Sequence, residues 1–396
     1  MAGCHFFCNF AGNMKNAIDI RRMEGLKGLK EFVQFRYDMY RDCPWAVPFL
    51  YSEEINTLSS DKNAAFECCE ADYFMAYRDG KPVGRVAAII NHRANERWQR
   101  KQVRFGWLDF VDDMEVSKAL MECVERWGRE RGMKEMVGPL GFTDMDREGL
   151  LIEGFEEDAT MYINYNYPYY QQHLESLAGF EKDNDYMEYK VKVPEVVPDK
   201  FHKIGEMITK RYNLHVKKFT RKELLEDGKG HEIFDIINIT YNDLYGYSQL
   251  SDRQINQLVN DYIKIADLNL VTGIEDWNTP DHKLVGFGIT FPSFTAALRK
   301  TRDGRLLPFG WWHLLRTLKW HKTKVVDLLL IGVLPEYRQK GANSLIFDDL
   351  IQWFQRYHFE YAEAMQQMET NEGVRSQWQY LESRIHRKHR CYRKKL

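Results

Sequence analysis

The sequence predicts an α/β protein with a mixed sheet, built as two halves that repeat one order of elements. Two observations support this prediction. Apolar runs of strand length alternate with stretches of helical periodicity along the whole chain. In addition, Lys81-Pro-Val-Gly84 and Lys283-Leu-Val-Gly286 each stand directly before an apolar strand, which favours an internal duplication.

The composition is that of two folded domains in a chain of 396 residues, 44% of them hydrophobic and 14% aromatic. A formal net charge of -2 argues against a DNA-binding protein. The seven cysteines have neither zinc-ligand nor disulfide spacing, so we expect no metal. No apolar run is long enough to span a bilayer, and residues 1–14 have no basic leader. We therefore expect a tail at 1–14, no integral membrane segment and a cytoplasmic protein.

The first half, residues 15–193, is predicted to begin with a helix at Leu26–Tyr40. The Asp79-Gly80 pair between two apolar runs predicts a β-hairpin, because both residues tolerate positive φ. The later elements are expected to be a strand at Arg104–Val111, a helix at Met114–Arg131, a strand at Lys134–Gly138, a helix at Tyr169–Leu177 and a strand at Tyr186–Val193.

The second half, residues 194–396, begins where Pro194 and Pro198 interrupt the chain. Its expected elements are helices at Asp199–Tyr212 and Ser251–Ala266, strands at Leu268–Ile274, from Lys283 and at Asp327–Val333, a helix after residue 343, a strand at Tyr361–Met368, a helix at Gly373–Ser383 and a basic last strand. We interpret that last strand as a solvated edge protected by its charges. The aromatic insertion Phe294–Lys322 is open to two interpretations, a lid or acyl groove and an amphipathic helix packed on the sheet.

The strand at Asp327–Val333 and the turn after it are the most informative segment. The continuous branched apolar run predicts a strand buried on both faces, and Pro335 predicts its end. The basic turn Arg338-Gln-Lys-Gly341-Ala-Asn343 then opens an amphipathic helix. A helix N-terminus offers unpaired amides and a positive dipole end, and Gly341 permits close approach to the backbone. The segment therefore predicts a phosphate site.

This segment resembles the acyl-CoA-binding motif of the GNAT acyltransferases, a strand followed by Arg/Gln-x-x-Gly-x-Gly/Ala, with Asn343 at the last position. With the order of elements, the chain resembles a tandem GNAT protein over about residues 15–396. The resemblance implies an N-acyltransferase that uses acetyl-CoA or another acyl-CoA. It also implies that the cofactor contacts Ile331, Gly332, Val333, Arg338, Gln339, Lys340, Gly341, Ala342, Asn343 and Asn371.

The first half is expected to be a degenerate copy that shapes the acceptor side. At the position of the phosphate turn it has four carboxylates and no glycine, in Asp109–Glu115, which would repel a diphosphate. Its loops at Gly138–Asp144 and Asn164–Tyr170 are interpreted either as lining of an acceptor pocket or as packing elements.

The candidate catalytic residues follow the strand at Tyr361–Met368. Glu369 is a candidate general base, although a solvated strand end explains it as well. Asn371 is a good helix N-cap as well as a cofactor contact. In GNAT proteins a Tyr often follows that Asn by seven residues as general acid; here Trp378 stands there, and Tyr380 is the substitute candidate.

The expected acceptor is a small-molecule amine or an amino-acid-like amine, with an acyl carrier protein or tRNA as less expected partners. Two alternatives remain open at this point. One is a Fem-like transferase that uses aminoacyl-tRNA, which the basic last strand favours. The other is a non-catalytic acyl-CoA sensor, which Asn343 and Trp378 favour. Acceptor identity, acyl length, the acid and base, and oligomeric state do not follow from the sequence.

Overall fold

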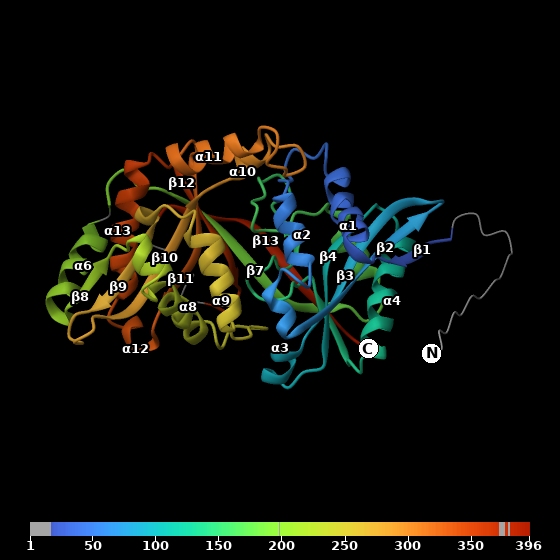
Figure 1. Ribbon diagram of the computed structural model, residues 1–396, viewed down its shortest axis with the longest axis horizontal. Coiled ribbons are helices and arrows are strands. Elements are labelled where there is room, and N and C mark those ends of the chain that lie inside the picture. Colours follow the sequence, from blue (N-terminus) through green and yellow to red (C-terminus); the bar gives the residue numbers. More distant parts are fainter. Residues whose placement is uncertain (1–16, 198, 372–376, 379–380) are drawn as a thin grey trace.

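The structure is a computed structural model that describes residues 17–197, 199–371, 377–378 and 381–396. Its strands form one 13-stranded sheet, and helices pack against it in both halves (Figure 1). The predicted mixed α/β class is therefore confirmed.

The first half of the chain supplies the strands β1 (Asp19–Arg22), β2 (Cys69–Arg78), β3 (Lys81–Asn91), β4 (Gln102–Phe110), β5 (Glu135–Gly138), β6 (Leu150–Glu153) and β7 (Glu181–Lys192). Its helices are α1 (Gly25–Met39), α2 (Tyr51–Leu58), η1 (Ala64–Glu67), α3 (His92–Arg97), α4 (Met114–Glu130) and α5 (Tyr169–Ser176). The predicted β2–β3 hairpin is confirmed, and both residues of its turn, Asp79 and Gly80, have positive φ as the turn chemistry requires.

The second half supplies the strands β8 (Leu214–Lys217), β9 (Val271–Asp276), β10 (Lys283–Pro292), β11 (Val325–Val333), β12 (Tyr361–Met368) and β13 (Ser383–Lys395). Its helices are α6 (Asp199–Tyr212), α7 (Arg221–Leu225), α8 (Lys229–Thr240), α9 (Asp252–Leu258), η2 (Val259–Ile263), η3 (Leu268–Leu270), α10 (Thr295–Leu298), α11 (Gly310–Trp320), α12 (Pro335–Arg338) and α13 (Ala342–Arg356). The helix expected at Gly373–Ser383 lies largely outside the described residues.

The order of strands is symmetric about the middle of the sheet. From one edge it runs β1-β2-β3-β4-β5-β13-β7-β12-β11-β10-β9-β8, and β6 pairs with β13. The two glycines of the repeated motif occupy equivalent places, since Gly84 pairs with Phe110 and Gly286 pairs with Val333. Phe110 and Val333 are each the last residue of the equivalent strands β4 and β11. The pairing pattern thus agrees with two copies of one fold.

Each half gives its last strand to the other half. β7 of the first half pairs with β12 of the second, and β13 pairs with β5 and β6 of the first, while β7 and β13 pair with each other. The interpretation of the last strand as a solvated edge is therefore wrong. The charges of β13 meet acids of neighbouring strands instead of water, as Lys388 does with Glu153 and Arg390 with Asp185, both at 2.8 Å.

A buried charged cluster holds the exchanged strands together. Arg387 of β13 lies 2.6 Å from Glu188 of β7 and 3.2 Å from Glu363 of β12, and it donates to the carbonyl of Asp158. His389 of β13 lies 2.7 Å from the other oxygen of Glu188. Burial by itself would raise the pKa of Glu188, but the charges of Arg387 and His389 outweigh it and lower that pKa to about 2.

We expect Arg387→Met to lower the free energy of unfolding at pH 7 by about 3–5 kcal/mol, because it leaves two buried carboxylates without their cation. The depressed pKa of Glu188 contributes stability above its unfolded-state pKa, and this contribution is lost as the pH falls through about 2. In the variant Glu188 and Glu363 protonate at higher pH, so the penalty should narrow on acidification. Urea denaturation at pH 7 and pH 5 measures both effects.

A matched control is Arg384→Met on the same strand. Its ion pair with Glu157 has a half-exposed arginine, so the loss should stay below about 1 kcal/mol. Equal penalties for the two variants would contradict the central role of Arg387.

Candidate functional site

The central strand of the second half separates from its neighbour partway along its length. β11 pairs in parallel with β12 only over Val325–Leu328, and within the described residues it is paired beyond that point with β10 alone. Four consecutive residues, Leu328–Ile331, are part exposed although β11 lies inside the sheet. The predicted burial of this strand on both faces is therefore wrong, because the departing β12 leaves its apolar side chains open.

The edge of β11 that faces this opening has carbonyls held by side chains. The carbonyl of Ile331 accepts from the Tyr241 hydroxyl at 3.2 Å, and that of Val333 accepts from Arg338 Nε at 3.1 Å. Both donors belong to side chains and not to a neighbouring strand. An extended ligand could take their place without disturbing the sheet.

The turn after β11 leads into the N-terminus of α13. Gly341 adopts the left-handed conformation with φ 81° and provides no side chain to cap the helix. The amides of Lys340 and Gly341 donate to carbonyls of the preceding turn, and that of Ser344 donates back to Gly341. Among the described residues we find no acceptor for the amides of Ala342 and Asn343. These two donors lie at the positive end of a 15-residue helix.

Basic side chains surround this helix start. Arg338 and Gln339 are exposed, and the ammonium of Lys340 lies 4.1 Å from the ring centroid of Tyr337. The turn therefore presents two cations and two free amides on one side of the opening, a combination suited to a diphosphate.

Two glycines of the segment are needed for packing. A Cβ on Gly332 would lie 2.7 Å from the ring of Phe287, and one on Gly341 would lie 3.1 Å from Ile208 of α6. Substitution of Gly341 would therefore disturb the contact with α6 as well as the turn. Charge changes at its neighbours are the cleaner way to examine this turn.

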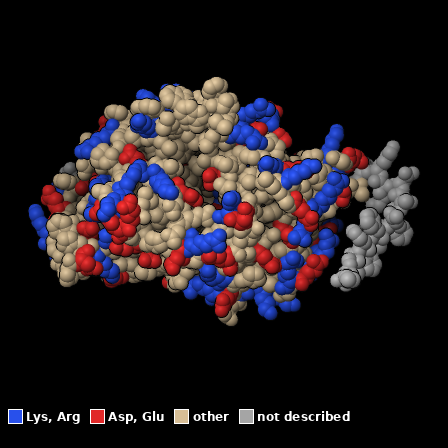
Figure 2. All heavy atoms as spheres, viewed as in Figure 1, with Lys and Arg blue, Asp and Glu red and all other residues tan. Residues whose placement is uncertain are grey.

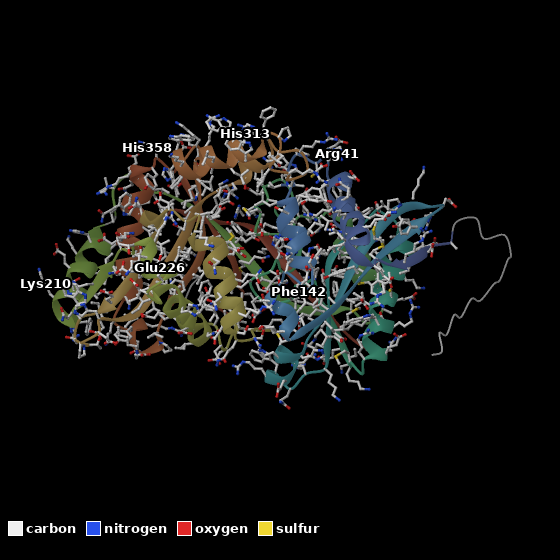
Figure 3. All side chains as sticks on the ribbon, viewed as in Figure 1. Arg41, Phe142, Lys210, Glu226, His313 and His358 are labelled. Carbon is white, nitrogen blue, oxygen red and sulfur yellow. The ribbon has the colours of Figure 1, made fainter. Side chains whose placement is uncertain are left out.

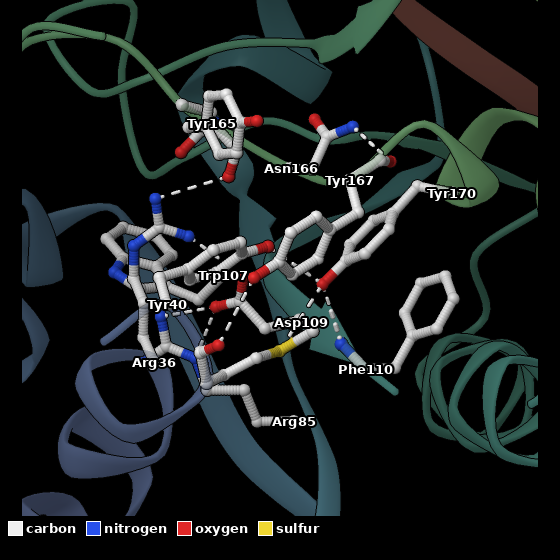
Figure 4. Close-up of polar contacts among 12 residues, drawn as sticks. Arg36, Tyr40, Arg85, Trp107, Asp109, Phe110, Tyr165, Asn166, Tyr167 and Tyr170 are labelled. Carbon is white, nitrogen blue, oxygen red and sulfur yellow. Dashed lines mark hydrogen bonds and ion pairs between the residues drawn. The ribbon is translucent and has the colours of Figure 1, made fainter. Parts of the chain in front are cut away.

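The equivalent opening in the first half is filled by the chain itself. β4 pairs with β5 only over Gln102–Arg104. At the far end of β4, the Tyr170 hydroxyl accepts from the Phe110 amide at 2.8 Å (Figure 4). The Tyr169 hydroxyl donates to the Phe110 carbonyl at 2.6 Å. The rings of Phe110 and Tyr170 stack with centroids 4.1 Å apart. The Tyr-rich loop thus packs where the second half remains open.

At least two of the four carboxylates in Asp109–Glu115 have partners within the first half. Asp109 is buried between Arg36 at 2.8 Å and Arg85 at 2.7 Å, as Figure 4 shows. Asp113 accepts from the Glu115 amide at 2.9 Å and so caps α4 where an anion would otherwise bind. A cavity of about 30 Å³ remains beside Asp109, room for about one water molecule. We therefore attribute the closure of this half to the tyrosines that fill its opening and to the cap on α4, and not to repulsion by carboxylates.

A loop of the first half that carries two carboxylates, Asp144 and Glu148, contacts β12 of the second half. Gln366 of β12 donates to the carbonyl of Glu148 at 2.8 Å. Arg104 donates to the carbonyls of Gly141 and Gly246 at 3.1 and 3.0 Å, and so joins this loop to the segment after α8. Asp144 lies in the same loop as Glu148, three residues beyond Gly141.

The environment of this pair favours the neutral acids. Burial raises the pKa of Asp144 to about 6, against the opposing charge of Arg104. Burial and then the negative charge of Asp144 raise the pKa of Glu148 well above its ordinary value. One oxygen of Asp144 is buried without a hydrogen-bond partner among the described residues, yet both side chains keep some solvent exposure. Sequence reasoning singled out the Gly138–Asp144 loop but assigned no acid or base there.

Of the two catalytic residues predicted from the sequence, Glu369 and Tyr380, the structure describes only Glu369. Glu369 pairs with Lys182 of β7 at 2.8 Å, and the Asn371 amide donates to the Met368 carbonyl. Tyr380 lies outside the described residues. Trp378 is buried, and its indole N–H donates to Gln367 of β12 at 3.1 Å. The roles of Glu369, Asn371 and Tyr380 stay predictions.

The described residues contain no group of three or more His, Cys, Asp or Glu placed to hold a metal ion. None of their helices has the length and apolar character required to cross a bilayer.

Known proteins give three comparisons. No family model matches the chain. Protein YghO of Escherichia coli (strain K12) is 24% identical over 382 residues, 95% of each chain, and the bacterial ceramide synthase of Caulobacter vibrioides is 26% identical over 315 residues, 76% of this chain and 77% of that one.

Two solved structures share the fold. A tandem GNAT protein from the clavulanic acid biosynthesis pathway has a TM-score of 0.55 at 9% identity and covers 96% of this chain and 98% of its own. A GCN5-related glucosamine N-acetyltransferase region of a fungal multi-domain protein has a TM-score of 0.57 at 11% identity, covering 96% of this chain and 38% of that one. The predicted fold of two tandem GNAT-like units is thereby confirmed.

We expect Asp144→Asn to raise the free energy of unfolding at pH 7 by on the order of 1–3 kcal/mol. Because the pKa of Asp144 is higher in the folded protein, the protonated acid stabilises the fold relative to the carboxylate. This stabilisation is complete below the unfolded-state pKa of about 4 and is lost as the pH rises through about 6. The asparagine variant avoids this loss, so its advantage should shrink toward pH 5. Asp243→Asn, at a fully exposed carboxylate, is the control and should change nothing. A destabilised Asp144→Asn would show that the carboxylate is structural.

Proposed function

We propose that this chain, which has the tandem GNAT fold, is an N-acyltransferase that moves an acyl group from an acyl-CoA thioester to an amine. The observation that carries the proposal is the part exposure of Leu328–Ile331 on an inner strand. That strand leads directly to a helix whose first amides lack acceptors among the described residues. An extended thioester arm ending in a diphosphate suits this order of features.

The cofactor would be held mainly by the second half. The amides of Ala342 and Asn343, with Arg338 and Lys340, would bind the diphosphate. The pantetheine arm would pair with the open edge of β11 and replace Tyr241 at the carbonyl of Ile331. The thioester would then lie along the apolar Leu328–Ile331 stretch, where backbone groups can stabilise a developing oxyanion.

The first half would supply the proton acceptor. An amine arrives as ammonium and must lose a proton before it attacks the thioester carbon. We assign this step to Asp144 and Glu148, because a carboxylate with a raised pKa is a stronger base than an ordinary one. The nitrogen gives its first proton to the carboxylate before attack. As the C–N bond forms and the C–S bond breaks, the nitrogen gives its second proton to solvent and the coenzyme A thiolate takes one proton from solvent. The carboxylate then returns its proton to solvent, so one proton is released overall.

The acyl chain and the acceptor are proposed to be long and apolar. The side chains open beside the thioester position are Leu328, Leu329, Leu330 and Ile331. One relative is named a bacterial ceramide synthase, and a ceramide is an amide between a fatty acid and a long-chain amino alcohol. A long-chain acyl-CoA with a long-chain amino alcohol is therefore the first pair to test, with acetyl-CoA as the short comparison.

The Fem-like alternative loses its main support. The basic last strand favoured tRNA only while its charges were expected to face solvent. In the structure Arg387 is buried, and Arg393 lies 2.8 Å from Glu181. The sensor alternative differs only in catalysis, so a turnover measurement distinguishes it.

Calorimetric titration with coenzyme A tests the cofactor site. Wild type should bind, and Lys340→Glu should raise Kd about tenfold or more, equivalent to about 1.4 kcal/mol, because a repulsive charge replaces an attractive one. Lys118→Glu on α4, the corresponding helix of the first half, is the control and should leave Kd unchanged. Equal affinity of wild type and Lys340→Glu, or binding of tRNA without coenzyme A, would refute the assignment.

Turnover tests the chemistry. Release of free thiol from palmitoyl-CoA in the presence of sphinganine, with the amide detected by mass spectrometry, is expected for wild type. Because the base must be ionised, kcat/KM should fall as the pH drops through about 6, and Asp144→Asn should lose at least about 100-fold while retaining coenzyme A binding. Coenzyme A binding without amide formation across an amine panel would favour the sensor.

A further inference from the structure

The segment between β10 and β11 carries an unusual concentration of exposed apolar side chains. Residues 306–320 hold six of the exposed large hydrophobic residues among those described: Leu306, Leu307, Phe309, Trp311, Trp312 and Trp320. Leu307 and Phe309 are 76% and 73% exposed. A soluble surface rarely gathers so many large apolar groups without a partner.

The outward side chains of α11 form an aromatic ridge. The ring centroids of Trp311 and Trp312 lie 5.8 Å apart, and those of Trp312 and Trp320 lie 5.7 Å apart. The opposite face of the helix packs on the body of the protein through part-buried Leu314 and Leu318. The helix is therefore held in place with its tryptophans outward.

Positive charge surrounds this ridge. Residues 299–324 contain eight Lys or Arg and a single acid, Asp303, which Arg41 approaches at 3.5 Å. All eight basic residues are exposed, and for six of them we find no carboxylate partner among the described residues: Lys300, Arg302, Arg305, Arg316, Lys319 and Lys322. Figure 2 shows this upper edge as mainly uncharged, with Lys and Arg on either side, and Figure 3 places His313 of α11 and Arg41 along the same edge.

We propose that residues 299–324 dock the protein on the surface of an anionic lipid bilayer. Tryptophan and phenylalanine partition to the boundary between headgroups and acyl chains, and basic residues beside them bind anionic headgroups. A ridge that projects from the surface can insert into a bilayer, whereas a site that binds a protein partner through apolar contacts is usually a groove. The described helices include none that could span the membrane, so the protein lies on the bilayer.

The aromatic ridge lies close in sequence to the open strand of the proposed site. α11 leads through a short turn into β11, the strand with the open Leu328–Ile331 stretch. A protein docked by α11 holds that strand near the source of any membrane-borne long-chain substrate. The docking itself does not depend on the proposed acyl transfer, because it rests on other residues.

Flotation with vesicles tests the proposal with the full-length chain. Wild type should float with vesicles of phosphatidylglycerol and phosphatidylcholine and bind pure phosphatidylcholine at least tenfold more weakly. The double variant Trp311→Ser and Trp312→Ser should reduce binding to the anionic vesicles at least tenfold. Trp277→Ser removes a tryptophan that is 47% exposed on another surface, against 46% for Trp311, and should bind like wild type.

A second variant separates charge from insertion. Arg316→Glu with Lys319→Glu should abolish the preference for anionic vesicles, and thermal unfolding and turnover with dispersed short-chain substrate should match wild type in every variant. Failure of wild type to float, or equal flotation of all variants, would overturn the proposal. A dimer in light scattering that dissociates in the double variant Trp311→Ser and Trp312→Ser would also overturn the proposal, because the ridge would then be an interface between two copies.

Discussion

The exchange of the last strand between the halves is the constraint on which the rest of the molecule depends. β7 and β13 lie side by side in the middle of one sheet, and each completes the half to which it does not belong. Arg387 and Glu188 form a buried ion pair across these two strands, so separating the strands would leave Glu188 without the guanidinium that neutralises it. The two halves are thus one folding unit in energetic terms.

The opening beside the central strand differs between the two copies of the fold. Where the central strand leaves its neighbour, backbone groups and a helix N-terminus become available. The first half satisfies them internally, with the hydroxyls of Tyr169 and Tyr170 at Phe110 and the carboxylate of Asp113 at α4. In the second half the side chains of Tyr241 and Arg338 donate to carbonyls of β11, and the start of α13 has no side-chain cap. One copy is closed by its own chain, and in our proposal the other binds the cofactor.

The sequence was sufficient for most elements, for the duplication and for the strand–turn–helix order over Asp327–Asn343, because periodicity and turn chemistry are local properties. The sequence did not predict which strands pair with each other across the two halves. The basic alternation of β13 is the pattern of a solvated edge. Acids on neighbouring segments, such as Glu153 of β6, Asp185 of β7 and Glu363 of β12, make the same charges compatible with the centre of a sheet. The exposure of Leu328–Ile331 was also beyond local reasoning, since it results from the path of β12.

The assignment of acid and base illustrates the same limit. Asp144 and Glu148 belong to a loop of one half and act, in our proposal, on a ligand of the other. Burial raises the pKa of both groups, and the negative charge of Asp144 raises that of Glu148 further. Neither the burial nor this contact can be read from the order of residues along the chain. Such a pair opposes folding when it is ionised, and the exchanged strands supply the stability that permits it. A second half without the first would lack both these carboxylates and β7, the partner strand of β12. In our proposal the site therefore needs both copies, as the sheet does.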